Sequence, residues 1–348
     1  MDGVRGGGEA GLSGPRRVRI ALVALSSTVL FIFAAGCAVR PAIILLPDAP
    51  AGRLAIFVDG REALVYQYAA SLDLPHYWPM RSPSGKNLLV QKTEPYPHHR
   101  AFLFADAVRP EGEREGSLYN ALYSGVKTEE APAGAENAPP AYGPPFRDRI
   151  RHKGFTRLET AGRSAVVEAD LVWETDGSRP ILDERRRLVV HDLRRGEYVL
   201  DITWILTAAH GEVHFVSDDV HYARPYLRLD PAFSGDRGGK IVSDTGAAGE
   251  KATTMRPARW IDYSNTVEGI SEGIAVFQWP DGREHRWLTR EYGTFGPRRP
   301  DELSGKPLIL KKGESISQRV GVLVHRGDVR GGRVRERYER YIAGAWEK

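Results

Sequence analysis

The chain has 348 residues, of which 41% are hydrophobic and 27% are charged, so most of it can bury a core and is expected to be globular. Its single cysteine excludes an intramolecular disulfide framework and a cysteine-rich structural zinc site. Of the formal net charge of +4, residues 1–36 supply +2 (four arginines against Asp2 and Glu9), and the remaining +2 argues against nucleic acid as a partner.

The N-terminus has the parts of a secretory signal peptide. Four arginines precede Ile20–Ala35, which is almost free of polar residues, and small residues follow. This apolar stretch is short for a bilayer span, which takes roughly 20 residues. Ala34-Ala35-Gly36-Cys37 resembles a bacterial lipobox, in which the cysteine is lipidated. We therefore predict a signal peptide over residues 1–36, lipid attachment at Cys37, and export as a membrane-anchored lipoprotein of the cell envelope.

Two alternatives remain for this segment. Ile20–Ala35 is a membrane-spanning anchor if Cys37 is incidental, and Arg16-Arg17 is a weak match to a twin-arginine export signal. Residues 37–52 read as the lipidated cysteine and a tether leading into the first strand. No later segment approaches membrane-spanning length.

The body of the chain shows the period-two alternation of half-buried strands. The clearest cases are Ser164–Glu174, Tyr198–Leu206 and Ile316–Val324, in which apolar residues share one face. Shorter candidate strands are Leu54–Val58, Ala63–Tyr68, Asn87–Gln91, Ala101–Ala105, Arg186–Val190, Val213–Val216, Gly273–Phe277 and Arg286–Thr289.

One segment alone favours a helix. Val334–Ala343 places Val334, Tyr338, Tyr341 and Ile342 on one face. Residues 129–145 are rich in Pro and Ala and predict an exposed loop. Without βαβ alternation, the pattern predicts an all-β fold: a large antiparallel two-sheet β-sandwich of the supersandwich type, forming a single domain over residues 53–348 with one C-terminal helix.

Three groups of polar residues are candidates for a site. His98 and His99 precede an apolar run, and in an extended segment their side chains point to opposite faces, so only one faces a cleft. The stretch from His210 to Arg224 contains Asp218 beside histidines. The third group combines His285, Trp287, Arg290 and Tyr292, and Trp260 has a similar setting. Ordinary loop contacts or core packing are the competing explanation for each group.

Five segments then occur in a telling order: Pro75–Gly85 (PHYWPMRSPSG), Pro97–Arg100 (PHHR), Trp260–Ser264 (WIDYS), Trp287–Phe295 (WLTREYGTF) and Val324–Asp328 (VHRGD). This order resembles the bacterial family labelled PmoA-like, or "methane oxygenase PmoA", over roughly residues 54–343. Pro95-Tyr96 replaces the family's Asp-His, and Phe215–His221 departs from its acidic segment, which implies altered or absent activity. Asp218 stands in for a family carboxylate. Methane oxidation itself is rejected, because the body lacks spanning helices.

The resemblance and the polar groups together predict a cleft that binds or acts on a carbohydrate or polyol. In an enzyme of lyase, epimerase or hydrolase type, His99 is the acid or base with His98 beside it, and Asp218 orients or shares the proton. Arg100, His285, Arg290 and Tyr292 hold the substrate, and Trp260 or Trp287 forms a stacking floor. No cofactor is expected.

Two other functions remain open. The first is a non-catalytic binding or structural envelope module, which the departures from the family pattern favour. The second is a copper or zinc protein with ligands from His98 or His99 together with His221, His285 or His325.

Overall fold

The structure is a computed structural model that describes residues 41–94, 96–125, 143–216, 223–300 and 306–346. Arg40–Lys348 forms one compact unit, and the other unit, Met1–Val39, lies outside the described residues. The predicted signal peptide and Cys37 therefore lie outside the described residues, as do Asp218, His221 and most of the predicted loop at 129–145. Within the described residues, no helix is long and apolar enough to cross a bilayer.

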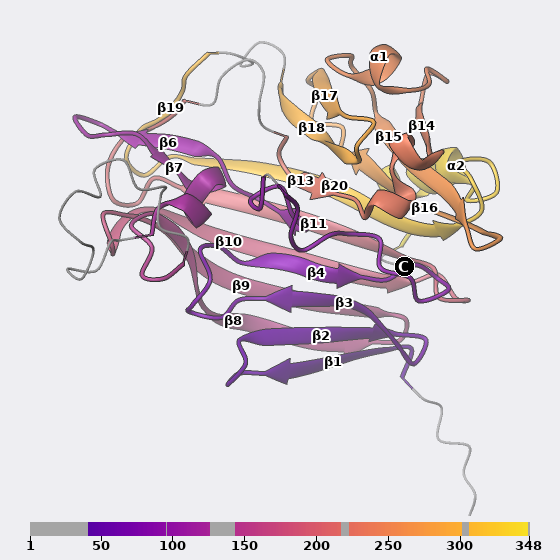
Figure 1. Ribbon diagram of the computed structural model, residues 1–348. Coiled ribbons are helices and arrows are strands. Elements are labelled where there is room, and N and C mark those ends of the chain that lie inside the picture. Colours follow the sequence, from indigo (N-terminus) through magenta and orange to yellow (C-terminus); the bar gives the residue numbers. More distant parts are fainter. Residues whose placement is uncertain (1–40, 95, 126–142, 217–222, 301–305, 347–348) are drawn as a thin grey trace, which may run out of the picture. The chain divides into compact units, whose positions relative to one another are not determined.

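Two eight-stranded sheets make up most of the fold (Figure 1). The first sheet has the order β1-β2-β3-β4-β5-β13-β18-β17. Its strands are β1 (Ile43–Asp48), β2 (Arg53–Val58), β3 (Arg61–Gln67), β4 (His76–Met80), β5 (Phe102–Leu103), β13 (Tyr226–Arg228), β18 (Thr294–Pro300) and β17 (His285–Thr289).

The second sheet has the order β14-β15-β16-β20-β11-β10-β9-β8. Its strands are β14 (Lys240–Ser243), β15 (Trp260–Val267), β16 (Ile270–Gln278), β20 (Ser315–Arg326), β11 (Tyr198–Thr207), β10 (Arg179–Asp192), β9 (Ser164–Thr175) and β8 (Arg149–Ala161). A smaller sheet joins β19 (Leu308–Leu310), β12 (Val213–Phe215), β6 (Ala107–Pro110) and β7 (Gly116–Ser117). Every strand pair described is antiparallel, for example β10 with β11 and β2 with β3.

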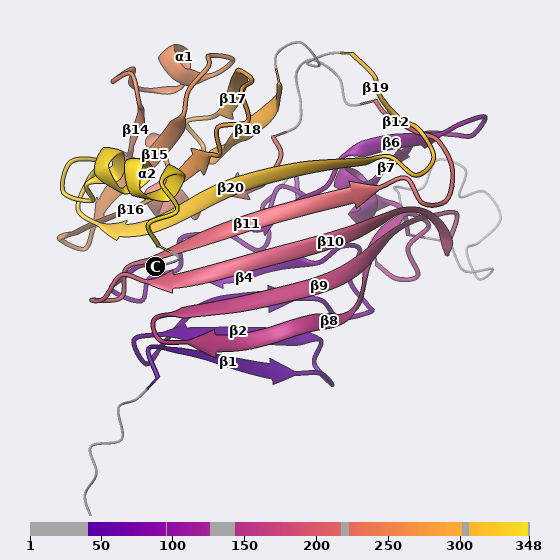
Figure 2. The same ribbon diagram turned by 180° about the vertical axis from the view of Figure 1, so that it is seen from behind.

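The large sheets lie face to face, as views from the front and from behind show (Figures 1 and 2). One core cluster contains Ile56 and Tyr66 from the first sheet together with Leu171, Leu188 and Ile202 from the second. Alternation along the strands produces this arrangement, because residues two apart point to the same face. The predicted all-β sandwich is confirmed.

The opposite face of the second sheet carries the C-terminal helix α2 (Val334–Ile342). Val199, Phe277 and Leu323 on that face pack against Val334, Tyr338 and Tyr341 of α2. The predicted helix is therefore present, with its expected apolar face buried. A four-residue helix, α1 (Glu250–Thr253), and short 3₁₀ turns are additional.

Several local predictions differ from the structure. The predicted strand at Asn87–Gln91 makes only isolated bridges, Arg81 with Asn87 and Leu89 with Leu229. The predicted strand at Ala101–Ala105 shrinks to Phe102–Leu103, because Ala101 has a positive φ of 54° that interrupts extended backbone. Residues 43–48, inside the predicted tether, form β1, which pairs with β2 along its whole length.

Candidate functional site

Residues 96–99 form a tight turn and not the extended segment that the sequence predicts. The backbone N–H of His99 donates to the carbonyl of Tyr96 at 2.9 Å, and the Thr93 hydroxyl donates to the carbonyls of Tyr96 and His99. The turn brings the imidazoles of His98 and His99 together, with ring centroids 4.1 Å apart. Both rings are half-buried. The prediction that they point to opposite faces is therefore wrong.

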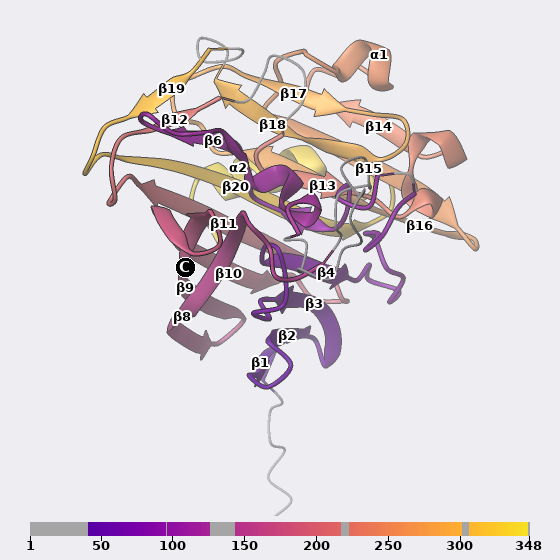
Figure 3. The same ribbon diagram turned by 60° about the vertical axis from the view of Figure 1, so that its left-hand side comes forward.

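Tyrosines surround this histidine pair. The Nδ1 atom of His98 lies 2.5 Å from the hydroxyl of Tyr123, and its ring meets Tyr119 edge-on at 5.6 Å. The ring of His99 lies 5.7 Å from Tyr226. Tyr119 and Tyr123 belong to the 3₁₀ helix η1 (Leu118–Tyr123), which lies beside β13 (Figure 3).

The turn between β17 and β18 completes the group. The Arg228 guanidinium lies over the ring of Tyr292 at 4.4 Å and donates to the Thr294 hydroxyl at 3.3 Å. The hydroxyls of Tyr226 and Thr294 are 3.1 Å apart. We call the set formed by Tyr96, His98, His99, Tyr119, Tyr123, Tyr226, Arg228 and Tyr292 the histidine–tyrosine cluster. Its rim is open, because Tyr96 is 55% and Tyr292 is 38% exposed.

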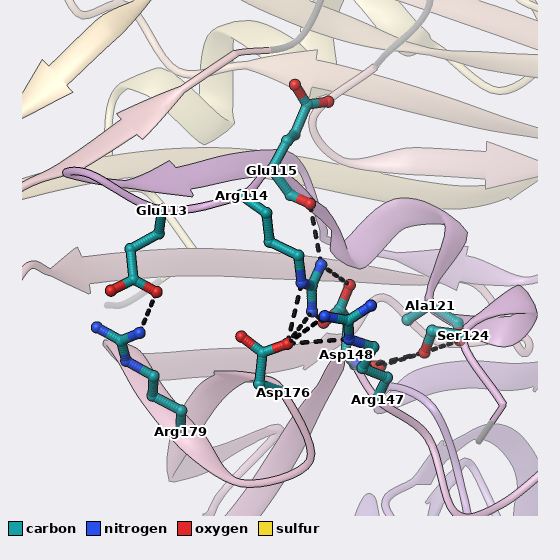
Figure 4. A network of polar contacts seen from close by, with 9 residues as sticks. All are labelled: Glu113, Arg114, Glu115, Ala121, Ser124, Arg147, Asp148, Asp176 and Arg179. Atoms are coloured by element: carbon teal, nitrogen blue, oxygen red, sulfur yellow. Dashed lines mark hydrogen bonds and ion pairs between the residues drawn. The ribbon is translucent and has the colours of Figure 1, made fainter.

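An ion-pair network holds η1 in place (Figure 4). Ser124, directly after η1, donates its hydroxyl to the carbonyls of Ala121 and Asp148, and it accepts from the Asp148 N–H. The Asp148 carboxylate binds Arg114, which also reaches Asp176 at 2.8 Å. The network therefore ties the end of η1 to Asp148, the residue directly before β8, and so positions Tyr123 against His98.

Both histidines of the cluster are neutral at physiological pH. Burial lowers the pKa of His98 to about 4, and the positive charge of Arg100 acts in the same direction. Burial also lowers the pKa of His99 to about 4, with further contributions from His98 and Arg228. A neutral imidazole offers one hydrogen-bond donor and one acceptor. His99 uses neither for a side-chain hydrogen bond to any residue that the structure describes.

Arg100 does not line this site, contrary to its predicted role in holding substrate. It is 8% exposed and forms an ion pair with the buried carboxylate of Asp73. The turn at residues 96–99 reverses the chain and directs the guanidinium inward, where a partner is needed because an unpaired buried charge is costly.

The predicted tryptophan floor is absent, because both indoles are core residues. Trp287 is fully buried, and its N–H donates to the carbonyl of Ala258 at 2.7 Å. Trp260 is 3% exposed and belongs to the cluster under α2, behind the second sheet. Neither ring offers a face to a ligand.

The remaining predicted residues have separate surroundings. His285 is buried between the carbonyl of Arg298, at 2.8 Å, and the carboxylate of Asp281, at 3.0 Å. Arg290 donates to Glu250 and Thr254. Of the predicted residues that the structure describes outside the histidine pair, Tyr292 alone joins the cluster, through Arg228.

A histidine-ligated metal site gains no support within the described residues. No group of three or more His, Cys, Asp or Glu side chains there is arranged to hold a metal ion. His325 pairs with the buried Asp262 at 2.7 Å, and His285 is paired as described above. Both are thus committed to partners away from His98 and His99.

Sequence reasoning missed Tyr119, Tyr123, Tyr226 and Arg228. Tyr119 and Tyr123 are four residues apart, a spacing that shares one face of an α-helix, although the segment is a 3₁₀ helix in the structure. Tyr226 and Arg228 are two apart, the spacing that shares one face of a strand. Both signals are visible in the sequence, but nothing local relates either pair to His98.

The chain belongs to a family of unknown function. The model described as "Family of unknown function (DUF6807)" matches residues 53–339. The resemblance to a PmoA-like family is therefore wrong. Its five segments are short and rich in Pro, Gly, His and Trp. Turns and cores of many β proteins contain the same residue types, so the order of these segments does not define a family. The comparison with curated proteins gave no match.

Solved structures with a similar arrangement include carbohydrate-active enzymes. The α-galactosidase AgaB from Geobacillus stearothermophilus has 9% identity and a TM-score of 0.47, over 83% of this chain and 42% of that chain. The galactosidase domain of the α-galactosidase–sucrose kinase AgaSK has 8% identity and a TM-score of 0.43, over 82% and 42%. Galactose 1-epimerase from Lactobacillus acidophilus has 9% identity and a TM-score of 0.34, over 82% and 98%. The chain thus spans about two-fifths of the galactosidase chains.

Proposed function

We propose that the chain binds a neutral saccharide or polyol at the histidine–tyrosine cluster. The observation that carries this proposal is the pairing of two uncharged, half-buried imidazoles with tyrosine rings at an open rim. Tyrosine rings provide apolar faces with polar tips, which suits a ligand whose ring carries both C–H groups and hydroxyls. Uncharged imidazoles exchange hydrogen bonds with hydroxyls without attracting an ion.

Individual residues have distinct roles in this proposal. His99 supplies a donor and an acceptor that no described side chain uses. Tyr292 supplies an exposed ring, whose orientation is held by the guanidinium of Arg228 on one face. His98 is held by Tyr123, so it contributes through the remaining ring nitrogen.

Binding without turnover fits the described geometry better than catalysis does. A catalytic cleft was expected to combine His99, Arg290 and a carboxylate within hydrogen-bond reach. Among the described residues, no carboxylate is hydrogen-bonded to His98 or His99, and the Arg290 side chain is directed to Glu250.

The binding test is a calorimetric titration with galactose, glucose, raffinose and myo-inositol. We expect at least one probe to bind, and His99→Gln and Tyr292→Ala each to weaken its binding about tenfold, a loss of 1.4 kcal/mol. His210→Gln is the control, because His210 is an exposed histidine that pairs with Asp183 of β10, and neither residue belongs to the histidine–tyrosine cluster. Absence of binding by all four probes, or equal affinity in every variant, contradicts the proposal.

One observation favours proton transfer as a second candidate function. The hydrogen bond between Tyr123 and His98 Nδ1 joins two groups that exchange protons with substrates in many enzymes. The same saccharides, followed by NMR for anomeric exchange or cleavage, test this function. If the protein turns over a saccharide, and Tyr123→Phe loses this turnover but still binds the saccharide, the protein is an enzyme. Binding without turnover supports the non-catalytic binding module instead.

We also propose that Cys37 anchors the protein to the cell envelope, a proposal that rests on the sequence of residues 1–37. An acyl chain contributes about 0.8 kcal/mol for each buried CH₂ group. Cys37→Ser is expected to move the processed protein from the membrane fraction to the soluble fraction. A variant that remains in the membrane and is not cleaved shows instead that Ile20–Ala35 is a spanning anchor.

A further inference from the structure

A pocket lies where the ends of two strand pairs approach the C-terminal helix. The β8–β9 turn, the segment between β10 and β11, and α2 enclose a cavity of about 660 Å³. This volume lies in the range of roughly 300–1,000 Å³ that small-molecule sites occupy. We call it the arginine pocket, since its lining includes Arg163, Arg194, Arg333, Arg337, Arg340 and Trp346.

The arginine pocket carries excess positive charge. Its five arginines face two lining carboxylates, Asp192 and Glu336. Asp192 binds Arg163 at 2.6 Å, and Arg337 is held by Glu197, which lies beside the lining, at 2.8 Å. Counting Glu197, five positive and three negative charges leave an excess of two.

Three of the arginines have no acidic partner in the part of the chain that the structure describes. Among the residues that the structure describes, no carboxylate forms an ion pair with Arg194, Arg333 or Arg340. All three are exposed. The Arg340 guanidinium is fixed over the ring of Trp346, at 4.1 Å from the ring centroid. These groups come from different elements, yet they line one cavity.

The backbone at two of these residues is strained. Arg194 has a φ of 71° and Arg333 has a φ of 51°, in the left-handed region that non-glycine residues rarely adopt. Strain of this kind persists where the surrounding structure enforces it, and it concentrates at ligand sites. Within the described chain, neither Arg194 nor Arg333 forms an ion pair that would offset this strain.

We propose that the arginine pocket binds a small organic anion of saccharide size, whose phosphate or carboxylate is held by Arg194, Arg333 and Arg340. The planar guanidinium fork matches both groups through paired N–H···O bonds. The site is separate in composition from the histidine–tyrosine cluster, since the two share no residue. It therefore extends the proposed function to a second, charged ligand.

Calorimetric titration of the full-length protein with glucuronate, glucose 6-phosphate and inorganic phosphate tests this inference. We expect at least one organic anion to bind at millimolar concentration or below and to bind more tightly than inorganic phosphate. Arg194→Gln and Arg333→Gln should each weaken binding about tenfold, because each removes a charge-assisted hydrogen bond. Higher ionic strength should weaken binding further.

Arg53→Gln is the matched control. Arg53 is an exposed arginine at the start of β2 that pairs with Asp48, so its loss changes the net charge equally without touching the pocket. Competition by vesicles containing phosphatidylglycerol distinguishes a lipid headgroup from a soluble anion as the natural source. Tyr292→Ala leaves the arginine pocket intact. If this variant still binds the anion while its saccharide binding is weakened, the two proposals are tested independently of each other. No binding by any probe, or equal loss in Arg53→Gln, overturns the inference.

Discussion

His325 and Asp262 form a buried ion pair between strands of the second sheet. Both side chains are fully buried, and the His325 Nε2 lies 2.7 Å from an Asp262 carboxylate oxygen. The other ring nitrogen faces the carbonyl of Arg326 at 3.2 Å, and Ser264 donates to the second carboxylate oxygen. Burial disfavours the charged ring, but Asp262 and the Arg326 carbonyl together outweigh it and raise the pKa of His325.

Asp262→Asn should destabilise the protein by about 3 kcal/mol, because removing one member of a buried ion pair leaves the other unpaired. Asp281→Asn is the control, since its carboxylate also pairs with a buried histidine, His285, but is 40% exposed. We expect that change to cost no more than about 1 kcal/mol. Urea denaturation of both variants measures the difference, and equal losses contradict the distinction.

For individual residues, the sequence indicated suitable residue types for a site better than it indicated where their side chains lie. His98 and His99 were recognised as a pair, but the hydrogen bond from His99 N–H to Tyr96 turns the chain and cancels the strand alternation. Arg100, Trp260 and Trp287 have residue types suited to a sugar site, yet all three are buried. Burial depends on partners that are distant in sequence, such as Asp73 for Arg100, which no local pattern reveals.

Among the elements, the strands with clear alternation of apolar and polar residues were predicted with the most accurate bounds. β9, β11 and β20 have predicted bounds that agree with the structure to within two residues, although part of each strand is buried on both faces. β18 was missed because it is buried along its whole length and contains Arg298 and Arg299, which read as loop residues. β8 was missed because it lies at the edge of its sheet and is largely exposed toward its C-terminal end.

Gly296 in β18 sits where two backbones approach closely. A Cβ atom there would lie 2.0 Å from the carbonyl oxygen of Pro225 and 2.8 Å from Ala223. Since Pro225 immediately precedes β13, an added methyl group must push β13 and β18 apart, and with them Tyr226 and Arg228.

Gly296→Ala should therefore destabilise the protein by about 1–3 kcal/mol, the cost of overpacking, and should also weaken saccharide binding. Gly154→Ala in β8 is the matched control, because a Cβ there meets nothing within 4 Å. We expect Gly154→Ala to be neutral or slightly stabilising, since alanine restricts the unfolded chain. Thermal unfolding of the two variants compares them directly, and a stable Gly296→Ala variant would show that β13 yields without cost.

Across the whole molecule, buried histidines make stability depend on pH. Burial is the largest cause that lowers the pKa to about 4 at four positions: His76, His98, His99 and His152. Their unfolded pKa is about 6.5, so the unfolded chain binds more protons than the folded chain between these values. Stability contributed by these groups is present above about pH 6.5 and is lost as the pH falls toward 4. His325 has the opposite sign, because its raised pKa contributes stability that is lost as the pH rises above its folded pKa.

Among the histidines that the structure describes, four with a lowered pKa against one with a raised pKa should make acid the more damaging direction. We expect the free energy of unfolding to fall as the pH is lowered from about 6.5 to about 5, a window in which ordinary carboxylates remain ionised. Chemical denaturation at closely spaced pH values measures this slope. His99→Gln should flatten it, because one group that takes up a proton on unfolding is removed. A slope that His99→Gln leaves unaltered would show that the pKa of His99 is the same in the folded and unfolded chain, and would contradict the lowered pKa on which the uncharged histidine pair of the proposed saccharide site rests.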